Sequence, residues 1–209
     1  MDRTYIRQRF EPKLENPILV AGFRGVGNIG RIVARLMIES TQAKIFAELY
    51  SPLFPDYVLI NRRGICRLPR YEFYVSTKGE NLIILTGDGE LPIEDVTAYY
   101  EISSDILDFV TQLGCRSIII IDGAPSLQPL GEVFVASTSR KRFKELTKKG
   151  AIPFVRGSII GVPGLLLGLA KRRKIEGVCI LGSTLGMEAD KETSFKVYEF
   201  LKKELEQYT

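Results

Sequence analysis

The sequence predicts one three-layer α/β/α domain over residues 1–209, built on a mostly parallel central sheet. Two observations carry this prediction. Apolar runs at 18–22, 81–88, 117–123 and 177–184 are continuous, as in parallel strands that are covered on both faces. Segments whose apolar residues recur at helical spacing, such as 93–113, lie between these runs. No change of composition marks a domain boundary, so the alternation is assigned to a single unit.

The first unit of the alternation is a strand, a glycine-rich turn and a helix. The turn contains Gly25-x-Gly27-x-x-Gly30, which matches the dinucleotide-binding pattern, and Glu48 lies near the position of the acidic residue in that pattern. Two interpretations stay open. The glycines let the helix pack closely on the sheet, or they let a phosphate approach the helix N-terminus. The ligand-contacting candidates of this turn are Arg24, Gly25, Gly27, Asn28 and Gly30.

Shorter strands are expected between the first helix and the second central run. They lie at 43–50, 58–60, 64–68 and 71–75. Two prolines break the chain at 51–56, and this loop places Leu53 and Phe54 beside turn residues, where we expect both side chains to be exposed. Exposed apolar residues on a loop are candidates for contact with a partner protein.

The second half of the chain continues the alternation. A strand is expected at 132–137, a basic helix at 139–149 and a helix at 165–170 that is apolar on nearly all sides. The basic helix presents either a solvated face or a contact for an acidic partner. The apolar helix is expected to be buried or to lie in an interface. An amphipathic helix at about 189–207 ends the chain.

Composition excludes several classes of function. The chain has no histidine, which excludes Ser-His-Asp and Cys-His catalysis and histidine-ligated zinc. A net charge of +4 is too small to indicate nucleic-acid binding. The three cysteines form no CxxC pair, and no apolar run approaches the ~20 residues of a membrane span. We therefore expect a cytoplasmic protein with no metal, no cofactor, and no nucleic-acid or membrane partner.

Polar residues at the carboxyl ends of the strands are the other candidates for chemistry, because open α/β sheets bind ligands there. Besides Arg24 and Asn28, these residues are Asp88, Asp122 and Ser183. Asp88 and Asp122 each follow a central apolar run and precede a glycine. They are either turn residues or ligands of a shared magnesium ion. The sequence contains no P-loop pattern.

Five segments in order are together more specific than any one of them. They are Ile18-Leu19-Val20-Ala21-Gly22 with Gly25-Val26-Gly27-Asn28-Ile29-Gly30, Ala47-Glu48-Leu49-Tyr50-Ser51-Pro52-Leu53-Phe54-Pro55, Leu85-Thr86-Gly87-Asp88, Gly161-Val162-Pro163-Gly164-Leu165-Leu166-Leu167-Gly168 and Gly177-Val178-Cys179-Ile180-Leu181-Gly182-Ser183-Thr184. In this order they resemble the archaeal branch of the proteasome assembly chaperone 2 family, over residues 17 to 185.

The resemblance implies a fold similar to nucleoside phosphorylases without an established catalytic site. It implies homo-oligomers, or mixed oligomers with a related subunit, and a role in proteasome assembly or activation through contact with the α-ring of the 20S proteasome. In this family and in proteasome activators, a C-terminal hydrophobic-Tyr-any motif can enter pockets between α subunits. This chain ends Gln207-Tyr208-Thr209. Tyr208 matches the motif and Gln207 departs from it, so tail binding and a plain end to the helix both stay open.

The sequence thus predicts a non-enzymatic protein that resembles proteasome assembly chaperones and acts through its surface. Its partner-binding candidates are Leu53, Phe54, Gln207, Tyr208 and Thr209. The alternative is a small-molecule or nucleotide-binding α/β enzyme that uses the Gly25–Gly30 turn.

Overall fold

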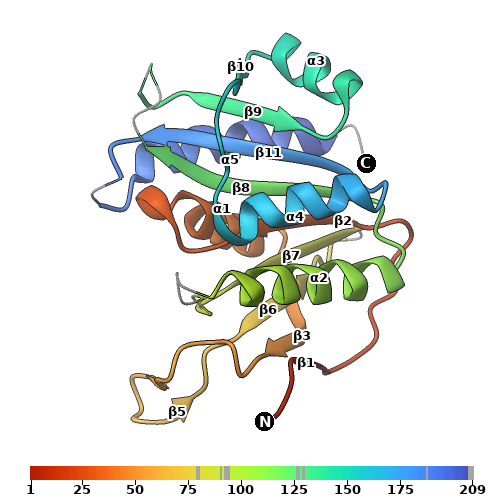
Figure 1. The fold of residues 1–209 in the computed structure, drawn as a ribbon, viewed down its shortest axis with the longest axis vertical. Helices are drawn as coiled ribbons and strands as arrows, with labels where there is room; N and C mark the ends of the chain where they lie inside the picture. Colours follow the sequence, from red (N-terminus) through yellow and green to blue (C-terminus); the bar gives the residue numbers. More distant parts are fainter. Residues whose placement is uncertain are drawn as a thin grey trace.

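The fold is a mixed α/β arrangement, seen in a computed structural model that describes residues 1–78, 81–89, 91, 95–125, 128, 130–186 and 188–206 (Figure 1). The strands are β1 (Tyr5–Gln8), β2 (Ile18–Gly22), β3 (Lys44–Tyr50), β4 (Leu59–Ile60), β5 (Cys66–Arg67), β6 (Tyr71–Val75), β7 (Leu82–Gly87), β8 (Ser117–Pro125), β9 (Val133–Ser137), β10 (Ile152–Pro153) and β11 (Glu176–Thr184). The helices are α1 (Ile29–Ser40), α2 (Val96–Gln112), α3 (Arg140–Lys148), α4 (Gly161–Arg172) and α5 (Lys191–Leu205), with the short 3₁₀ turn η1 (Val26–Asn28) before α1.

The large sheet is mixed, which corrects the expectation that it is mostly parallel. Its strand order is β1-β3-β6-β7-β2-β8-β11-β9-β10. The four central strands β7, β2, β8 and β11 run parallel to their neighbours in this group. On one side, β1, β3, β6 and β7 pair antiparallel in succession, and on the other β9 pairs antiparallel with β11. The described residues between β3 and β7 contain no helix, and β3, β6 and β7 turn back as antiparallel neighbours.

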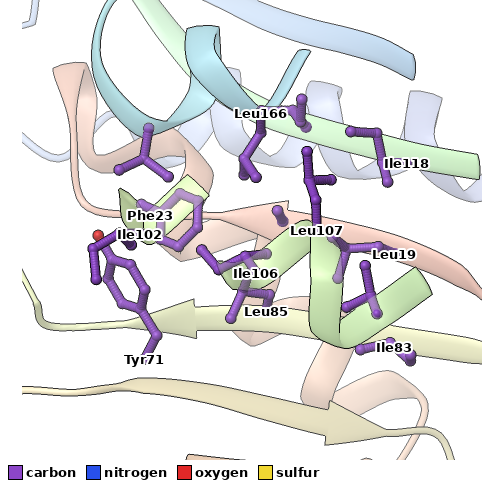
Figure 2. Packing of buried hydrophobic residues seen from close by; sticks show 14 of the residues in the cluster. Leu19, Phe23, Tyr71, Ile83, Leu85, Ile102, Ile106, Leu107, Ile118 and Leu166 are labelled. Carbon is purple, nitrogen blue, oxygen red and sulfur yellow. The ribbon is translucent and has the colours of Figure 1, made fainter. Parts of the chain in front are cut away.

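Two apolar cores cover the two faces of the sheet, which confirms the three layers (Figure 1). Helices α2 and α4 bury Ile106 and Leu166 over one face, against Leu19, Leu85 and Ile118 (Figure 2). Helices α1 and α5 cover the other face, and their core also takes in a buried leucine of α3. Residues of β2, β7 and β8 alternate between the two cores. This two-sided burial explains why their sequences are continuously apolar.

The element ends follow local capping chemistry. Asp95, Ser139 and Asp190 precede α2, α3 and α5, and each side chain accepts a hydrogen bond from a backbone N–H in the first turn. Helix α4 begins at Gly161, four residues before the predicted start. Strand β1 precedes the first strand that the sequence predicted, at 18–22. None of the helices, within the residues described, is both long and apolar enough to cross a membrane.

Helix α3 is held to α5 by buried charges, so its basic face is not wholly solvated. Arg142 is 5% exposed, and its guanidinium bonds the carboxylate of Glu204, which is fully buried. Lys149 Nζ donates to the other oxygen of Glu204 at 2.9 Å. Arg142 also donates to Glu145 at 2.6 Å. These ion pairs fix the position of α3, because loss of Glu204 would leave the buried guanidinium of Arg142 without its carboxylate on α5.

Candidate functional site

A cavity of about 560 Å³ opens at the carboxyl ends of β2, β7 and β8. Its walls combine aromatic rings with a few polar groups. Phe23 follows β2, Tyr71 begins β6, and Tyr99 comes from α2. Figure 2 shows the rings of Phe23 and Tyr71 close together, and their centroids are 4.8 Å apart. Cavities of this size and composition, at the carboxyl edge of an α/β sheet, are the usual place for a small-molecule ligand.

The glycine-rich turn forms one wall of the cavity and packs closely against the sheet. A Cβ atom on Gly30 would lie 2.5 Å from the carbonyl oxygen of Ile121 in β8. A Cβ atom on Gly25 would lie 2.9 Å from Asp122 Oδ1. Gly27 has a φ of +61°, which favours glycine, and lies against Thr184. Close packing therefore requires glycine at these positions, whether or not a ligand also approaches the turn.

Asn28 occupies the N-cap position directly before α1, but its side chain does not cap the helix. Its backbone is left-handed, with a φ of 53°, and its side chain makes no capping hydrogen bond to α1. Its Oδ1 atom is buried and has no hydrogen-bond partner among the described residues. Arg24 and Gly25 line the cavity, whereas Asn28 does not. The candidate residues of the turn are thus only partly brought together.

Asp122 is the half-buried acid of the cavity. It lies in β8, lines the cavity, and its Oδ1 accepts the N–H of Gly123 at 2.8 Å. Burial raises the pKa of Asp122 to about 6, because the charged carboxylate is poorly solvated there. This carboxyl group changes its charge near neutral pH. It can therefore accept a hydrogen bond from a ligand as a carboxylate, or donate one as the acid.

Asp88 lines the same cavity but is occupied by a structural contact. Arg67 in β5 donates from Nη1 and Nη2 to the two oxygens of Asp88, each at 2.8 Å. This bidentate pair raises the pKa of Arg67. The same pair ties the β4–β5 hairpin to the end of β7. Asp88 and Asp122 belong to no group of three or more metal-ligating side chains within the described part of the chain.

Two candidate residues lie away from the cavity. Glu48 is in β3, which β6 and β7 separate from β2, so it is not beside the glycine-rich turn as the dinucleotide pattern requires. Its buried carboxylate lies 2.8 Å from Arg9 and 2.5 Å from Arg70. Ser183 is fully buried in β11 and its Oγ accepts the N–H of Glu132 at 3.1 Å. The sequence order alone did not show that other strands intervene.

The expected exposure of Leu53 and Phe54 is wrong. Phe54 is 8% exposed, and its ring meets Tyr71 edge-on with centroids 5.0 Å apart. Leu53 is half-buried and packs against the same core. The two prolines turn the loop back onto the sheet, where Gly89 leaves space for the phenyl ring. Neither residue is a free surface anchor.

The exposed apolar surface lies immediately after that loop, on a projection that we call the hairpin arm, residues 57–68. Strands β4 and β5 pair only with each other, as a separate two-stranded sheet, and stand apart from the main body in Figure 1. The arm carries five large exposed apolar residues, namely Tyr57, Val58, Ile60, Ile65 and Leu68. Arg62 and Arg63 are exposed at its tip, and Cys66 is exposed on β5. Sequence reasoning found the two short strands but could not show that they are uncovered.

A second hollow, which we call the acidic groove, lies beside the loop between β11 and α5. It has a volume of about 520 Å³, and its lining includes Leu130, Leu185, Glu188 and Glu192. Leu185 is 70% exposed, and Phe195 on α5 is also exposed close by. The lining contains three acidic side chains and one lysine, Lys196. This groove combines exposed apolar surface with a negative charge.

The remaining candidates concern α4 and the C-terminus. Helix α4 buries Val162, Leu166 and Ala170, and packs against α2 and the sheet, as its apolar composition predicted. Gln207, Tyr208 and Thr209 lie outside the described residues, which end in α5 and Glu206. The tail motif is therefore a matter for experiment.

Comparison with known proteins gives consistent matches over nearly the whole chain. The pattern of the PAC2 family matches residues 19–207. The crystal structure of PbaB from Pyrococcus furiosus, an archaeal proteasome activator, superposes with a TM-score of 0.90 at 33% identity, covering 97% of this chain and 89% of that one. PbaA from the same organism, an archaeal homolog of proteasome-assembly chaperone, gives a TM-score of 0.83 at 27% identity, covering 98% and 82%. An uncharacterized protein of Methanocaldococcus jannaschii is 29% identical over 192 residues, covering 89% of this chain and 72% of that protein.

Proposed function

Because the chain belongs to the PAC2 family, we propose that it is a non-enzymatic proteasome assembly chaperone-like protein that forms oligomers and contacts the α-ring of the 20S proteasome or a related assembly subunit. The similarity to PbaB along almost the entire chain carries this proposal. The exposed hairpin arm and acidic groove support action through surfaces, since an apolar patch on a soluble protein usually marks a contact site.

The C-terminal tail is the part of this proposal that can be tested most directly. A terminal carboxylate can pair with a lysine, and a tyrosine ring buries apolar area while keeping a hydroxyl group for hydrogen bonding. We propose that Tyr208 supplies this anchor, with Gln207 and Thr209 beside it in the motif.

The experiment is co-elution with archaeal 20S particles and with isolated α-rings. The full chain, a chain ending at residue 206, and Tyr208→Ala are compared, with Tyr208→Phe as the matched control. We expect the full chain and Tyr208→Phe to co-elute with the particles. The chain ending at residue 206 and Tyr208→Ala are expected not to co-elute. Equal co-elution of all four would remove the tail from the proposal, and absence of co-elution by the full chain would overturn contact with the α-ring.

The cavity supports a second candidate function, a small-molecule or nucleotide-binding α/β enzyme. The observation in its favour is Asp122, a half-buried and poorly solvated carboxyl group at a cavity with aromatic walls. A ligand that binds only the folded chain raises its melting temperature. The test is a thermal melt with nucleotides, nucleosides and inorganic phosphate at millimolar concentration, for the natural chain and for Asp122→Asn. A shift that Asp122→Asn abolishes would support this candidate, and no shift with any probe would remove it.

A further inference from the structure

The hairpin arm projects from the main sheet, and none of the described strands of that sheet pairs with it. Its strands pair only with each other, and its apolar residues Ile60 and Ile65 are 62% and 63% exposed. The Arg67–Asp88 pair holds its base at the end of β7. An apolar arm that is anchored in this way loses little conformational freedom when it binds, which favours association. Its tip adds two exposed arginines, Arg62 and Arg63.

The acidic groove on the same chain is also apolar, but it carries the opposite charge. Leu185 and Leu130 give it apolar surface, with 70% and 39% of each residue exposed. Glu188 and Glu192 are exposed acids on its rim. Lys196 lies 3.7 Å from Glu192 and offsets part of that charge, whereas Asp190 is engaged as the cap of α5. A basic-tipped apolar projection and an acidic-rimmed apolar hollow are complementary in both charge and polarity.

The two surfaces are too far apart to meet within one chain. The arm is tied to the end of β7, whereas the groove adjoins the end of β11, and β2 and β8 lie between these strands. Figure 1 shows β5 at the end of the molecule remote from β11 and α5. The groove is therefore filled by an arm only if that arm belongs to another molecule.

We propose that the hairpin arm of one copy of this chain inserts into the acidic groove of the next copy, so that the protein assembles head to tail. This inference deepens the oligomerisation that the proposed function includes, and rests on it. In this arrangement a copy that is bound through its arm still offers a free groove to a further copy, which makes the contact heterologous. A heterologous contact repeats from copy to copy, and it gives a closed ring when the rotation between copies allows closure.

The experiment reverses the charge of each surface separately. The arm variant is Arg62→Glu with Arg63→Glu, and the groove variant is Glu188→Arg with Glu192→Arg. Sedimentation equilibrium of each is expected to show the 23.5 kDa mass of one chain, while the natural chain is larger. Arg140→Glu with Lys141→Glu is the matched control for the arm variant, because it makes the same charge change at two exposed residues of α3. Circular dichroism establishes that every variant is folded.

Mixing distinguishes this arrangement from a contact of arm with arm or of groove with groove. The arm variant keeps a natural groove and the groove variant keeps a natural arm, and the reversed arm and the reversed groove are also opposite in charge. An equimolar mixture is therefore expected to associate again, with the two variants alternating. Combining all four substitutions in one chain restores opposite charges and is expected to restore the natural mass.

Three outcomes would overturn the inference. A natural chain that sediments as a monomer would overturn both this inference and the proposed oligomerisation. A groove variant that keeps the natural mass, or two monomeric variants that do not pair when mixed, would overturn the head-to-tail contact alone. In the last two cases the proposed contact with the proteasome would still stand, because co-elution tests it separately.

Discussion

The glycine-rich turn and the hairpin arm differ in both their sequence pattern and their packing. The turn carries the most recognisable pattern in the sequence, and its atoms are packed so closely that a single added carbon would collide with neighbouring strands. The arm matches no pattern, and its largest side chains face solvent. A sequence pattern can therefore reflect a requirement of packing, while an exposed surface leaves little local signal in the sequence. Four measurements test this contrast.

The largest effect is expected at the turn. In Gly30→Ala, the new methyl group would lie 2.5 Å from the carbonyl oxygen of Ile121, so the helix must shift from the sheet. We expect the free energy of unfolding in urea to fall by about 3 kcal/mol. Gly168→Ala is the matched control, because nothing lies near its added carbon and alanine favours a helix. Equal stability of the two variants would show that the turn is not limited by packing.

The second prediction compares the stability lost by a substitution in the buried loop with that lost by one in the hairpin arm that follows it. Phe54→Ala removes a ring that is 8% exposed, and we expect a loss of about 3 kcal/mol in the free energy of unfolding. Ile60→Ala removes a side chain from a residue that is 62% exposed, and we expect a loss below about 0.5 kcal/mol under conditions where the chain is monomeric. Both are measured by urea denaturation. A similar loss in both would contradict the assignment of Phe54 to the core and Ile60 to the surface.

A smaller effect depends on pH. The pKa of Asp122 is raised to about 6 in the folded chain, so the folded state binds its proton more tightly than the unfolded state does. As the pH rises from 4 to 7, this group alone is expected to lower stability by about 2 kcal/mol. Asp122→Asn removes that loss, so its stability relative to the natural chain should increase over this range. Asp108→Asn, at an exposed carboxylate, is the control, and a pH-independent difference for Asp122→Asn would contradict the raised pKa.

The smallest effect concerns the base of the arm. Arg67→Gln removes the bidentate pair with Asp88, a contact worth about 1 kcal/mol at a half-exposed site. The arm is then expected to open several-fold more often, and trypsin should cut after Arg62 and Arg63 correspondingly faster, as read by mass spectrometry. Arg3→Gln is the control at an exposed arginine. Unchanged cleavage would mean that the Asp88 contact does not hold the arm.

The sequence predicted those parts of the fold that depend on local pattern. The central strands are continuously apolar because helices cover both of their faces, and the helical spacing within 93–113 correctly indicated α2. Strand direction depends on which strands become neighbours, so the mixed sheet was missed. The burial of Phe54 was missed for the same reason, since Tyr71 and Gly89 come from other parts of the chain.

The candidate site was predicted in part. Arg24, Gly25 and Asp122 do line one cavity, because β2 ends beside Ile121 and β8 carries Asp122 past that end. Glu48 does not line this cavity, because β6 and β7 lie between its strand, β3, and β2. The sequence from Tyr57 to Leu68 did not show that most of its large apolar side chains would be exposed. The likeness to nucleoside phosphorylases and the role of the tail stay predictions.

The exposed thiol on the hairpin arm has a practical consequence. Cys115 and Cys179 are buried, and burial raises the pKa of both thiols, to about 11 for Cys115, so neither reacts readily at neutral pH. Cys66 alone is accessible to a maleimide reagent. The natural chain thus carries one addressable position for a fluorophore, and it reports on the arm without any engineering.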